Sequence, residues 1–420
     1  MASEDRRRRL PFAFRTLDPA VRREVVYLEA NDSAQSSGVL YLPSNHSPRT
    51  AVYLMHPRGE FTRHYVVPGL VERGYGVFGQ NSRYLNNDTD MVHERLLLDI
   101  AAGMRFLRER GFQKVVLLGN SGGGSLLAFY QSQAERGPAE RIAMTPAGEP
   151  IDLATEIMPT GDLYIAAAAH PGEGRFMLNV LDPAVVDEGD PLRTDAAWDM
   201  YNPANGYRPF PEPSAYAASW LTGYRERQRE RNRRLDVLAR EYLGDQATGR
   251  SQLRAGAAHG SEAARRARLV RYLVVYRTLA NPAYLDPSID PNRRPIGSIF
   301  SPGDPIIGNY GAGGLARVMT PRAWLSTWSG LSSQADLPDT ISHVSVPTLM
   351  VYADGDSDIF PSEQREIFER SGAADRTYRL LEWADHYLNP VGIEGAALAD
   401  PRERLIDLVV PWIEARIGEP

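Results

Sequence analysis

The stretch that decides the fold is residues 115–130, Val-Val-Leu-Leu-Gly-Asn-Ser-Gly-Gly-Gly-Ser-Leu-Leu-Ala-Phe-Tyr. An apolar run at 115–118 predicts a strand, the turn 119–124 follows it, and a helical pattern begins at 126. A serine in so tight a turn needs glycine on both flanks, because a Cβ there would collide with the adjacent backbone. The turn presents Ser121 as an exposed hydroxyl at a helix N-terminus, where the dipole and free N–H groups favour a developing anion. Ser121 is therefore a candidate nucleophile.

Strands and helices alternate on both sides of this stretch. We expect strands at 25–27, 38–42, 51–55, 75–78, 163–167, 348–352 and 378–381, and helices at 65–73, 91–110 and 404–416. Strands separated by helices of this length form βαβ units. The predicted fold class is therefore α/β, a mostly parallel sheet with helices on both faces.

Between 172 and 340 this alternation stops, and the sequence becomes helical and polar. We expect one helix from an N-cap at Ser214 to about Tyr242, a second at about 262–279, and a loop rich in Pro, Gly, Asp and Asn at 282–305. The predicted domains are a core formed by 1–171 and 341–420 and a helical cap at 172–340. Because both ends of the insertion emerge at the carboxyl edge of the sheet, the cap should lie over that edge.

The composition excludes several classes of protein. The chain has 420 residues, 43% of them hydrophobic, which is enough for a buried core. Its net charge of −6 offers no basic surface, so we expect no nucleic-acid partner. The lack of cysteine excludes disulfides, thiolate nucleophiles and Cys-type metal sites. Four arginines at 6–9 precede only a brief apolar stretch, and no long apolar run follows, so we expect a cytoplasmic protein without membrane contact. Self-association into a homo-oligomer is left open.

Two further residues complete a catalytic pattern in chain order. The strand at 348–352 is followed by Ala-Asp-Gly-Asp-Ser-Asp at 353–358, which supplies carboxylates. Of the eight histidines, His386 alone lies beyond that strand, in a loop that follows the strand at 378–381. The order serine, aspartate, histidine is that of a Ser-His-Asp triad built on a nucleophile elbow.

These motifs resemble the α/β-hydrolase superfamily, and within it the cofactor-independent, esterase-like serine hydrolases that carry a helical cap. The resemblance covers about 50–172 and 345–415. It implies the α/β-hydrolase fold, Ser121 as nucleophile, His386 as general base and then acid, and Asp356 as the acid that orients the imidazole. Asp358 is left open as the alternative acid. No cofactor and no metal are implied.

The resemblance also implies an oxyanion hole. One donor would be the backbone N–H of Gly122, and the second would come from the loop after the strand at 51–55, which reads His56-Pro57-Arg58-Gly59. Since Pro57 has no N–H, the main chain of Arg58 is the expected second donor.

The function implied is hydrolysis of a carboxylic ester, or an amide, of a mainly apolar or aromatic small molecule through an acyl-enzyme. The alternatives are a carbon–carbon bond or thioester hydrolase with the same triad, and a non-catalytic ligand-binding protein of this fold. The candidate substrate-binding residues are His56, His170, Tyr216, Trp220 and Tyr224. The alternative for His170 is a structural role in packing. Tyr216, Trp220 and Tyr224 are spaced i, i+4, i+8, and their alternative role is to form the buried face of the cap helix.

Other motifs lead to weaker interpretations. The glycine-rich turn lacks the Lys-Ser/Thr of a phosphate-binding loop, and could otherwise simply pack a helix on a strand. The aspartates at 354, 356 and 358 match a calcium loop, but Ile359 and Arg365 stand where it needs glycine and glutamate. We interpret His93-Glu94 and the charged stretch 225–234 as solvated helix faces.

Overall fold

The computed structural model of the chain describes residues 17–311 and 314–420, so the arginines at 6–9 lie outside the described residues. Its centre is one eight-stranded sheet with strand order β1-β2-β4-β3-β5-β6-β11-β12. The strands are β1 Arg22–Glu29, β2 Gln35–Leu42, β3 Thr50–Met55, β4 Gly76–Asn81, β5 Lys114–Asn120, β6 Leu163–Ala167, β11 Thr348–Ala353 and β12 Arg376–Leu381. β2 is antiparallel to both of its neighbours, and the strands from β4 to β12 are parallel. The eight strands predicted from the sequence are confirmed.

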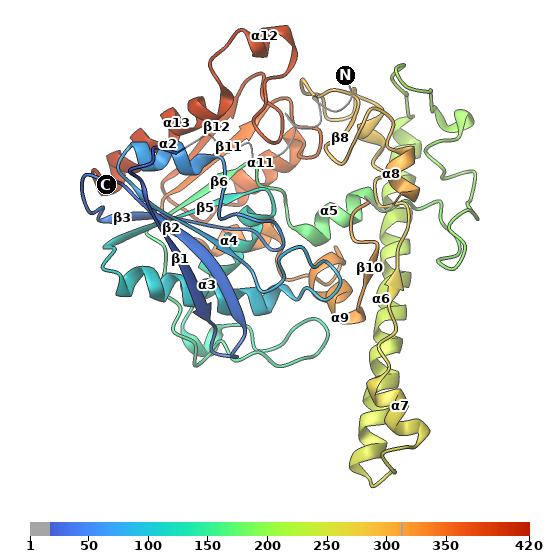
Figure 1. Cartoon of the computed structure of the whole chain (residues 1–420). Helices are drawn as coiled ribbons and strands as arrows, with labels where there is room; N and C mark the ends of the chain where they lie inside the picture. Colours follow the sequence, from blue (N-terminus) through green and yellow to red (C-terminus); the bar gives the residue numbers. More distant parts are fainter. Residues whose placement is uncertain (1–16, 312–313) are drawn as a thin grey trace.

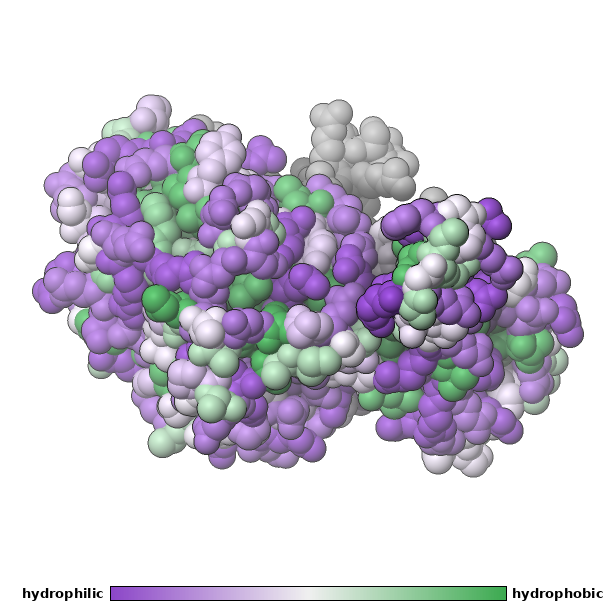
Figure 2. Space-filling view, turned by 90° about the horizontal axis from the view of Figure 1, so that it is seen from below, coloured by the Kyte–Doolittle hydropathy of each residue, from purple (hydrophilic) through white to green (hydrophobic). Residues whose placement is uncertain are grey.

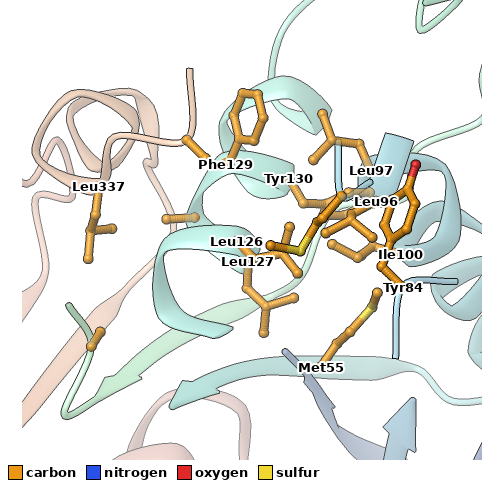
Figure 3. Close-up of a cluster of buried hydrophobic side chains, with 14 of the residues drawn as sticks. Met55, Tyr84, Leu96, Leu97, Ile100, Leu126, Leu127, Phe129, Tyr130 and Leu337 are labelled. Carbon is orange, nitrogen blue, oxygen red and sulfur yellow. The ribbon is translucent and has the colours of Figure 1, made fainter. Parts of the chain in front are cut away.

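Helices cover both faces of this sheet (Figure 1). On one face lie α3 His93–Glu109 and α4 Gly122–Ala134, and on the other lie α2 Val66–Glu72 and α13 Pro401–Ile417. Alternate residues of β5 enter opposite cores: Leu117 packs with α3 and α4, and Val116 packs with α2 and α13. This is why the strand is a continuous apolar run. Figure 3 shows the first core, where side chains of α4 meet those of α3.

The insertion between β6 and β11 is mainly helix and loop. Its helices are α5 Glu173–Val180, α6 Ala218–Arg254, α7 Glu262–Arg268, α8 Ile306–Tyr310, α9 Pro321–Ala323 and α10 Leu337–Thr340, with a π-helical turn at Trp324–Trp328. Its strands are β7 Leu273–Val274, β8 Gly297–Ser298, β9 Ser301–Pro302 and β10 Val318–Met319. It also contains single 3₁₀ turns at Pro203–Asn205, Pro282–Tyr284 and Ile341–His343. Outside it, α11 Pro361–Arg370 and α12 Gly392–Ala396 are short, and a 3₁₀ turn lies at Pro138–Glu140. The division into core and cap domains remains a prediction.

The two long helices expected in the insertion have different bounds. Ser214 is not the N-cap of α6, because its Oγ accepts the Arg208 N–H and the helix begins four residues later. α6 then runs for 37 residues, well past Tyr242, and forms with α7 an arm that projects from the body (Figure 1). The two helices approach closely at Gly249, where a Cβ would lie 2.5 Å from the Ala267 nitrogen. The prediction of one helix over 262–279 is also wrong, since α7 ends at Arg268 and is followed by β7, which pairs with β10.

Two segments expected to face solvent are partly buried. His93 and Glu94, at the start of α3, are covered by the turn at Trp324–Trp328: the His93 N–H donates to Ser326 Oγ, which donates to Glu94 Oε2. Within 225–234, Arg231 is buried and its guanidinium binds Glu188. In both places the insertion supplies polar partners that the local charge pattern does not reveal.

A helix that crosses a membrane must be both long and apolar. Among residues 17–311 and 314–420, none of the helices combines the length and the apolar character needed to cross a bilayer. Seen from below, the surface is mainly hydrophilic, with separate small hydrophobic patches (Figure 2).

Candidate active site

The candidate nucleophile stands on a strained turn between β5 and α4. Ser121 has φ 54° and ψ −128°, a backbone conformation that non-glycine residues rarely adopt. The surrounding glycines are required by close backbone contacts: a Cβ on Gly119 would lie 2.4 Å from the Gly124 Cα, and one on Gly123 would lie 2.4 Å from the Met55 carbonyl oxygen. The turn therefore holds the backbone of Ser121 in this strained conformation at the start of α4, where the residue is partly exposed.

Three side chains that are far apart in the sequence form one hydrogen-bonded chain. Ser121 Oγ lies 3.0 Å from His386 Nε2, and His386 Nδ1 lies 2.8 Å from Asp356 Oδ2. Asp356 and His386 are buried. With its proton on Nδ1, donated to Asp356, the imidazole presents Nε2 as an acceptor to the serine hydroxyl. Burial lowers the pKa of His386, but the charge and hydrogen bond of Asp356 outweigh it, so the pKa is raised.

The two candidate acids have different partners. Asp356 Oδ1 accepts the backbone N–H groups of Asp358 at 2.8 Å and Ile359 at 3.1 Å, which leaves Oδ2 for the imidazole. The Asp358 carboxylate instead accepts hydrogen bonds from Tyr284 Oη at 2.7 Å, Ser298 Oγ at 2.9 Å and the Ile299 N–H at 2.8 Å. Burial raises the pKa of Asp358 to about 6. The structure thus brings Asp356, and not Asp358, to His386.

The segment 354–358, called the acid loop below, also holds the insertion in place. Arg293 forms an ion pair with Asp354, and its backbone N–H donates to the Asp354 carbonyl at 2.7 Å. Asn292 Nδ2 donates to the Asp356 carbonyl at 2.8 Å. Together with the three donors on Asp358, these contacts join the segment 284–299 to the loop that carries the triad acid.

A cavity of about 530 Å³ opens in front of Ser121 and His386. Its apolar lining includes Phe61, Phe176, Ile299, Phe300, Leu315 and Ile359, and its polar lining includes His56, Arg58, Asp88, His170 and Glu173. Ile299, Phe300 and Leu315 come from the insertion, which therefore roofs the carboxyl edge of the sheet at this point. The volume is within the range of small-molecule sites.

The polar lining contains a compact charged group. Arg58 lies 3.3 Å from Asp88 and 3.8 Å from Glu173, whose side chain is 2% exposed. Glu173 Oε1 has no hydrogen-bond donor within the part of the chain that the structure describes. Burial, with the added effect of Glu173, raises the pKa of Asp88 despite the neighbouring guanidinium.

The expected substrate-binding residues divide into two groups. His56 and His170 lie in the cavity wall. Tyr216, Trp220 and Tyr224 do not: they pack with Met200 and Leu285 into a separate small core of the insertion. Their polar atoms donate to the carbonyls of Met200, Ala197 and Ala280 at 2.8–2.9 Å, so the stripe faces neighbouring insertion loops rather than the cavity. The expectation that these three residues roof the cavity is therefore wrong.

Several lining residues were missed by the sequence reasoning. Glu173 could have been found, because it follows β6 within six residues at the edge of the sheet where α/β sites form. Phe300 and Asp88 lie in loops without a periodic pattern, and the sequence offers no signal for them.

Of the two backbone N–H groups expected to form the oxyanion hole, one is not free to do so. Gly122 is the first residue of α4, so its N–H has no helical carbonyl to bind. The Arg58 N–H, expected to be the second donor, is directed into its own loop, where it donates to His56 Nδ1 at 3.2 Å; the Gly59 N–H donates to the same atom at 2.9 Å. Within the described ranges, no set of three or more His, Asp and Glu side chains is arranged to hold a metal ion.

Comparison with known proteins gives matches to solved structures alone. No family model matches the chain, and no curated protein matches it. The α/β hydrolase GrgF from Penicillium sp. sh18 is 12% identical, with 94% of this chain and 99% of that chain covered and a TM-score of 0.50. The esterase PF2001 from Pyrococcus furiosus is 12% identical, with 97% and 100% covered and a TM-score of 0.44. The esterase domain of a Rhodothermus marinus protein is 12% identical, with 94% and 100% covered and a TM-score of 0.43.

Proposed function

Because the chain has the α/β-hydrolase fold, we propose that it is a serine hydrolase that cleaves a carboxylic ester through an acyl-enzyme intermediate. The observation that carries this proposal is the continuous chain Ser121 Oγ, His386, Asp356, with distances of 3.0 and 2.8 Å, at the wall of a cavity. A binding protein has no need to bury a carboxylate behind an imidazole aimed at a strained serine, and this arrangement favours catalysis over the non-catalytic alternative.

The proposal gives a role to each side chain. Ser121 Oγ attacks the ester carbonyl while His386 Nε2 accepts its proton, and Asp356 stabilises the imidazolium that forms. The Gly122 N–H faces the oxygen that becomes negative. His386 then protonates the leaving alcohol, and water, activated by the same imidazole, releases the acid from the serine. This reaction needs no cofactor.

The cavity suggests the kind of substrate. Phe61, Phe176 and Phe300 supply apolar, aromatic surface for a small molecule, and Arg58 with its two carboxylates supplies polar groups in the same cavity. We therefore propose an ester with an apolar or aromatic portion and at least one polar group. A thioester, an amide or a carbon–carbon bond could react at the same triad, so the test includes them.

The test is labelling by a fluorophosphonate followed by turnover of p-nitrophenyl esters of graded acyl length, with a thioester, an anilide and a β-diketone alongside. We expect covalent modification of Ser121 and ester turnover that Ser121→Ala lowers on the order of 10⁴–10⁶-fold in kcat. Ser132→Ala is the matched control, because Ser132 lies on the same helix and its Oγ donates to the Phe129 carbonyl. If Ser121→Ala keeps activity near that of wild type, in a preparation free of other esterases, the proposal is refuted.

A further inference from the structure

We propose that the imidazole N–H of His56 is the second donor of the oxyanion hole, in the place where a backbone N–H was expected. The inference rests on the proposed function and deepens it, because it adds a catalytic side chain to the triad. It follows from the position of His56, its hydrogen bonds and the side of the serine on which it lies.

The distal nitrogen of His56 lies directly beside the residue that follows the nucleophile. A Cβ built on Gly122 would be 3.0 Å from His56 Nε2. Nε2 therefore lies where a side chain of residue 122 would stand, beside the residue whose N–H serves as the first donor. His56 is also part of the cavity wall that contains Ser121, so a carbonyl bound at the serine can reach it.

The loop fixes which nitrogen carries the proton. His56 Nδ1 accepts two backbone N–H groups, from Arg58 at 3.2 Å and Gly59 at 2.9 Å. An acceptor at Nδ1 leaves the proton of the neutral ring on Nε2, which is the nitrogen beside Gly122. Burial, together with the nearby Arg58 charge, lowers the pKa of His56 well below its usual range, so the ring stays neutral and its tautomer is defined. The bond that occupies the Arg58 amide is thus the bond that orients the imidazole.

The sheet topology separates His56 from the other imidazole nearby. His170 Nε2 is equally close to the Gly122 position, at 3.0 Å. However, β5 lies between β3, which His56 follows, and β6, which His170 follows, and His386 follows β12 beyond β6. His170 is thus on the side of Ser121 from which His386 approaches, and His56 is on the β3 side. The developing oxyanion points away from the general base, so the second donor is expected from the β3 side.

One neighbouring group opposes an oxyanion at this place. Glu173 Oε1 lies 2.7 Å from the position of a Gly122 Cβ, and a carboxylate raises the free energy of a nearby anion. The Arg58 guanidinium is 3.8 Å from the same oxygen and offsets its charge. A neutral N–H donor beside these groups stabilises the oxyanion without adding to the charge of the cavity lining.

The test is His56→Asn, with an ester and its thionoester, in which sulfur replaces the carbonyl oxygen. The shorter amide keeps an acceptor for the Arg58 and Gly59 N–H groups but has no donor at the Nε2 position. We expect kcat on the ester to fall on the order of 10²–10³-fold with KM changed little. Because sulfur is a poor acceptor, wild type should prefer the ester, and the ester to thionoester ratio of kcat/KM should fall at least about tenfold in the variant.

Controls separate the possible failures. His93→Asn changes a buried imidazole outside the cavity wall and should leave the ester to thionoester ratio unchanged. If His56→Asn keeps kcat within a few-fold of wild type, or loses ester and thionoester activity equally, the inference is overturned while the proposed function stands. If wild type neither reacts with the fluorophosphonate at Ser121 nor turns over an ester, the proposed function fails and the inference fails with it.

Discussion

Replacement of Asp356 by asparagine tests the triad at the point where the sequence left two choices. In the protein, Asp356 Oδ1 accepts two backbone N–H groups, from Asp358 and Ile359, and Oδ2 accepts the proton of His386 Nδ1. The two N–H donors will orient the asparagine so that its oxygen replaces Oδ1. The amide NH₂ group then faces Nδ1 of the imidazole. The loop keeps its hydrogen bonds, and the imidazole loses its acceptor.

The expected loss follows from this orientation. Facing a donor, the imidazole takes the tautomer with its proton on Nε2, and Nε2 can no longer accept the proton of Ser121. The negative charge that stabilises the imidazolium is lost as well. A substitution of this kind costs on the order of 10⁴ in kcat, or about 5.5 kcal/mol of transition-state free energy.

The assay compares Asp356→Asn with Asp358→Asn, using kcat for a p-nitrophenyl ester and the free energy of unfolding in urea. Asp358 binds donors of the insertion, so its substitution should lower stability by roughly 1–3 kcal/mol and leave kcat within about tenfold of wild type. A large loss of kcat in Asp358→Asn together with a small loss in Asp356→Asn would refute the assignment of the acid. Equal losses in both would indicate that the loop acts only as a structural unit.

Two further predictions concern the base and the insertion. Burial lowers the pKa of His386, but Asp356 raises it by more, so the pKa lies above its usual value of 6.5. Because the imidazole must be neutral to act as a base, the acid limb of kcat/KM against pH should have its midpoint above 6.5. A midpoint below 6 would contradict the ion pair. Trp220→Ala should lower the free energy of unfolding by roughly 2–4 kcal/mol, since the indole stacks on Tyr216 with ring centroids 5.1 Å apart. The ranking of esters by kcat/KM should not change in that variant, and a changed ranking would show that this core reaches the substrate.

The sequence predicts most of the fold and two members of the proposed triad, because local patterns and chain order can be read without the tertiary structure. A strand, a glycine-rich turn and a helix identify Ser121, and chain order identifies His386. The choice between Asp356 and Asp358 stayed open because both lie in one short loop and the direction of each side chain is set by its partners. Those partners, such as Tyr284 and Ser298, are far away in the sequence.

The remaining differences also arise from contacts that no local pattern records. The stripe of Tyr216, Trp220 and Tyr224 has the correct spacing for a buried face, but spacing does not reveal what covers that face. The Arg58 amide was a reasonable donor by position, and a side chain two residues earlier in its own loop occupies it. Sequence patterns therefore located the residues of the proposed triad, and the residues that line the cavity around them could be found only from the tertiary structure.

The acid loop limits how this protein can change during evolution. Asp354 and Asp358 are buried, and the insertion supplies partners to both of them. Arg293 pairs with Asp354, which also accepts the Trp383 N–H from outside the insertion, and the hydroxyls of Tyr284 and Ser298 donate to Asp358. An exchange of the insertion for another would remove the counter-charge of Asp354 and the hydroxyl donors of Asp358, at a cost of a few kcal/mol. A functional chimera would have to carry these donors with it or lose the two outer aspartates at the same time. The roof of the cavity and the acid of the triad are thus inherited together.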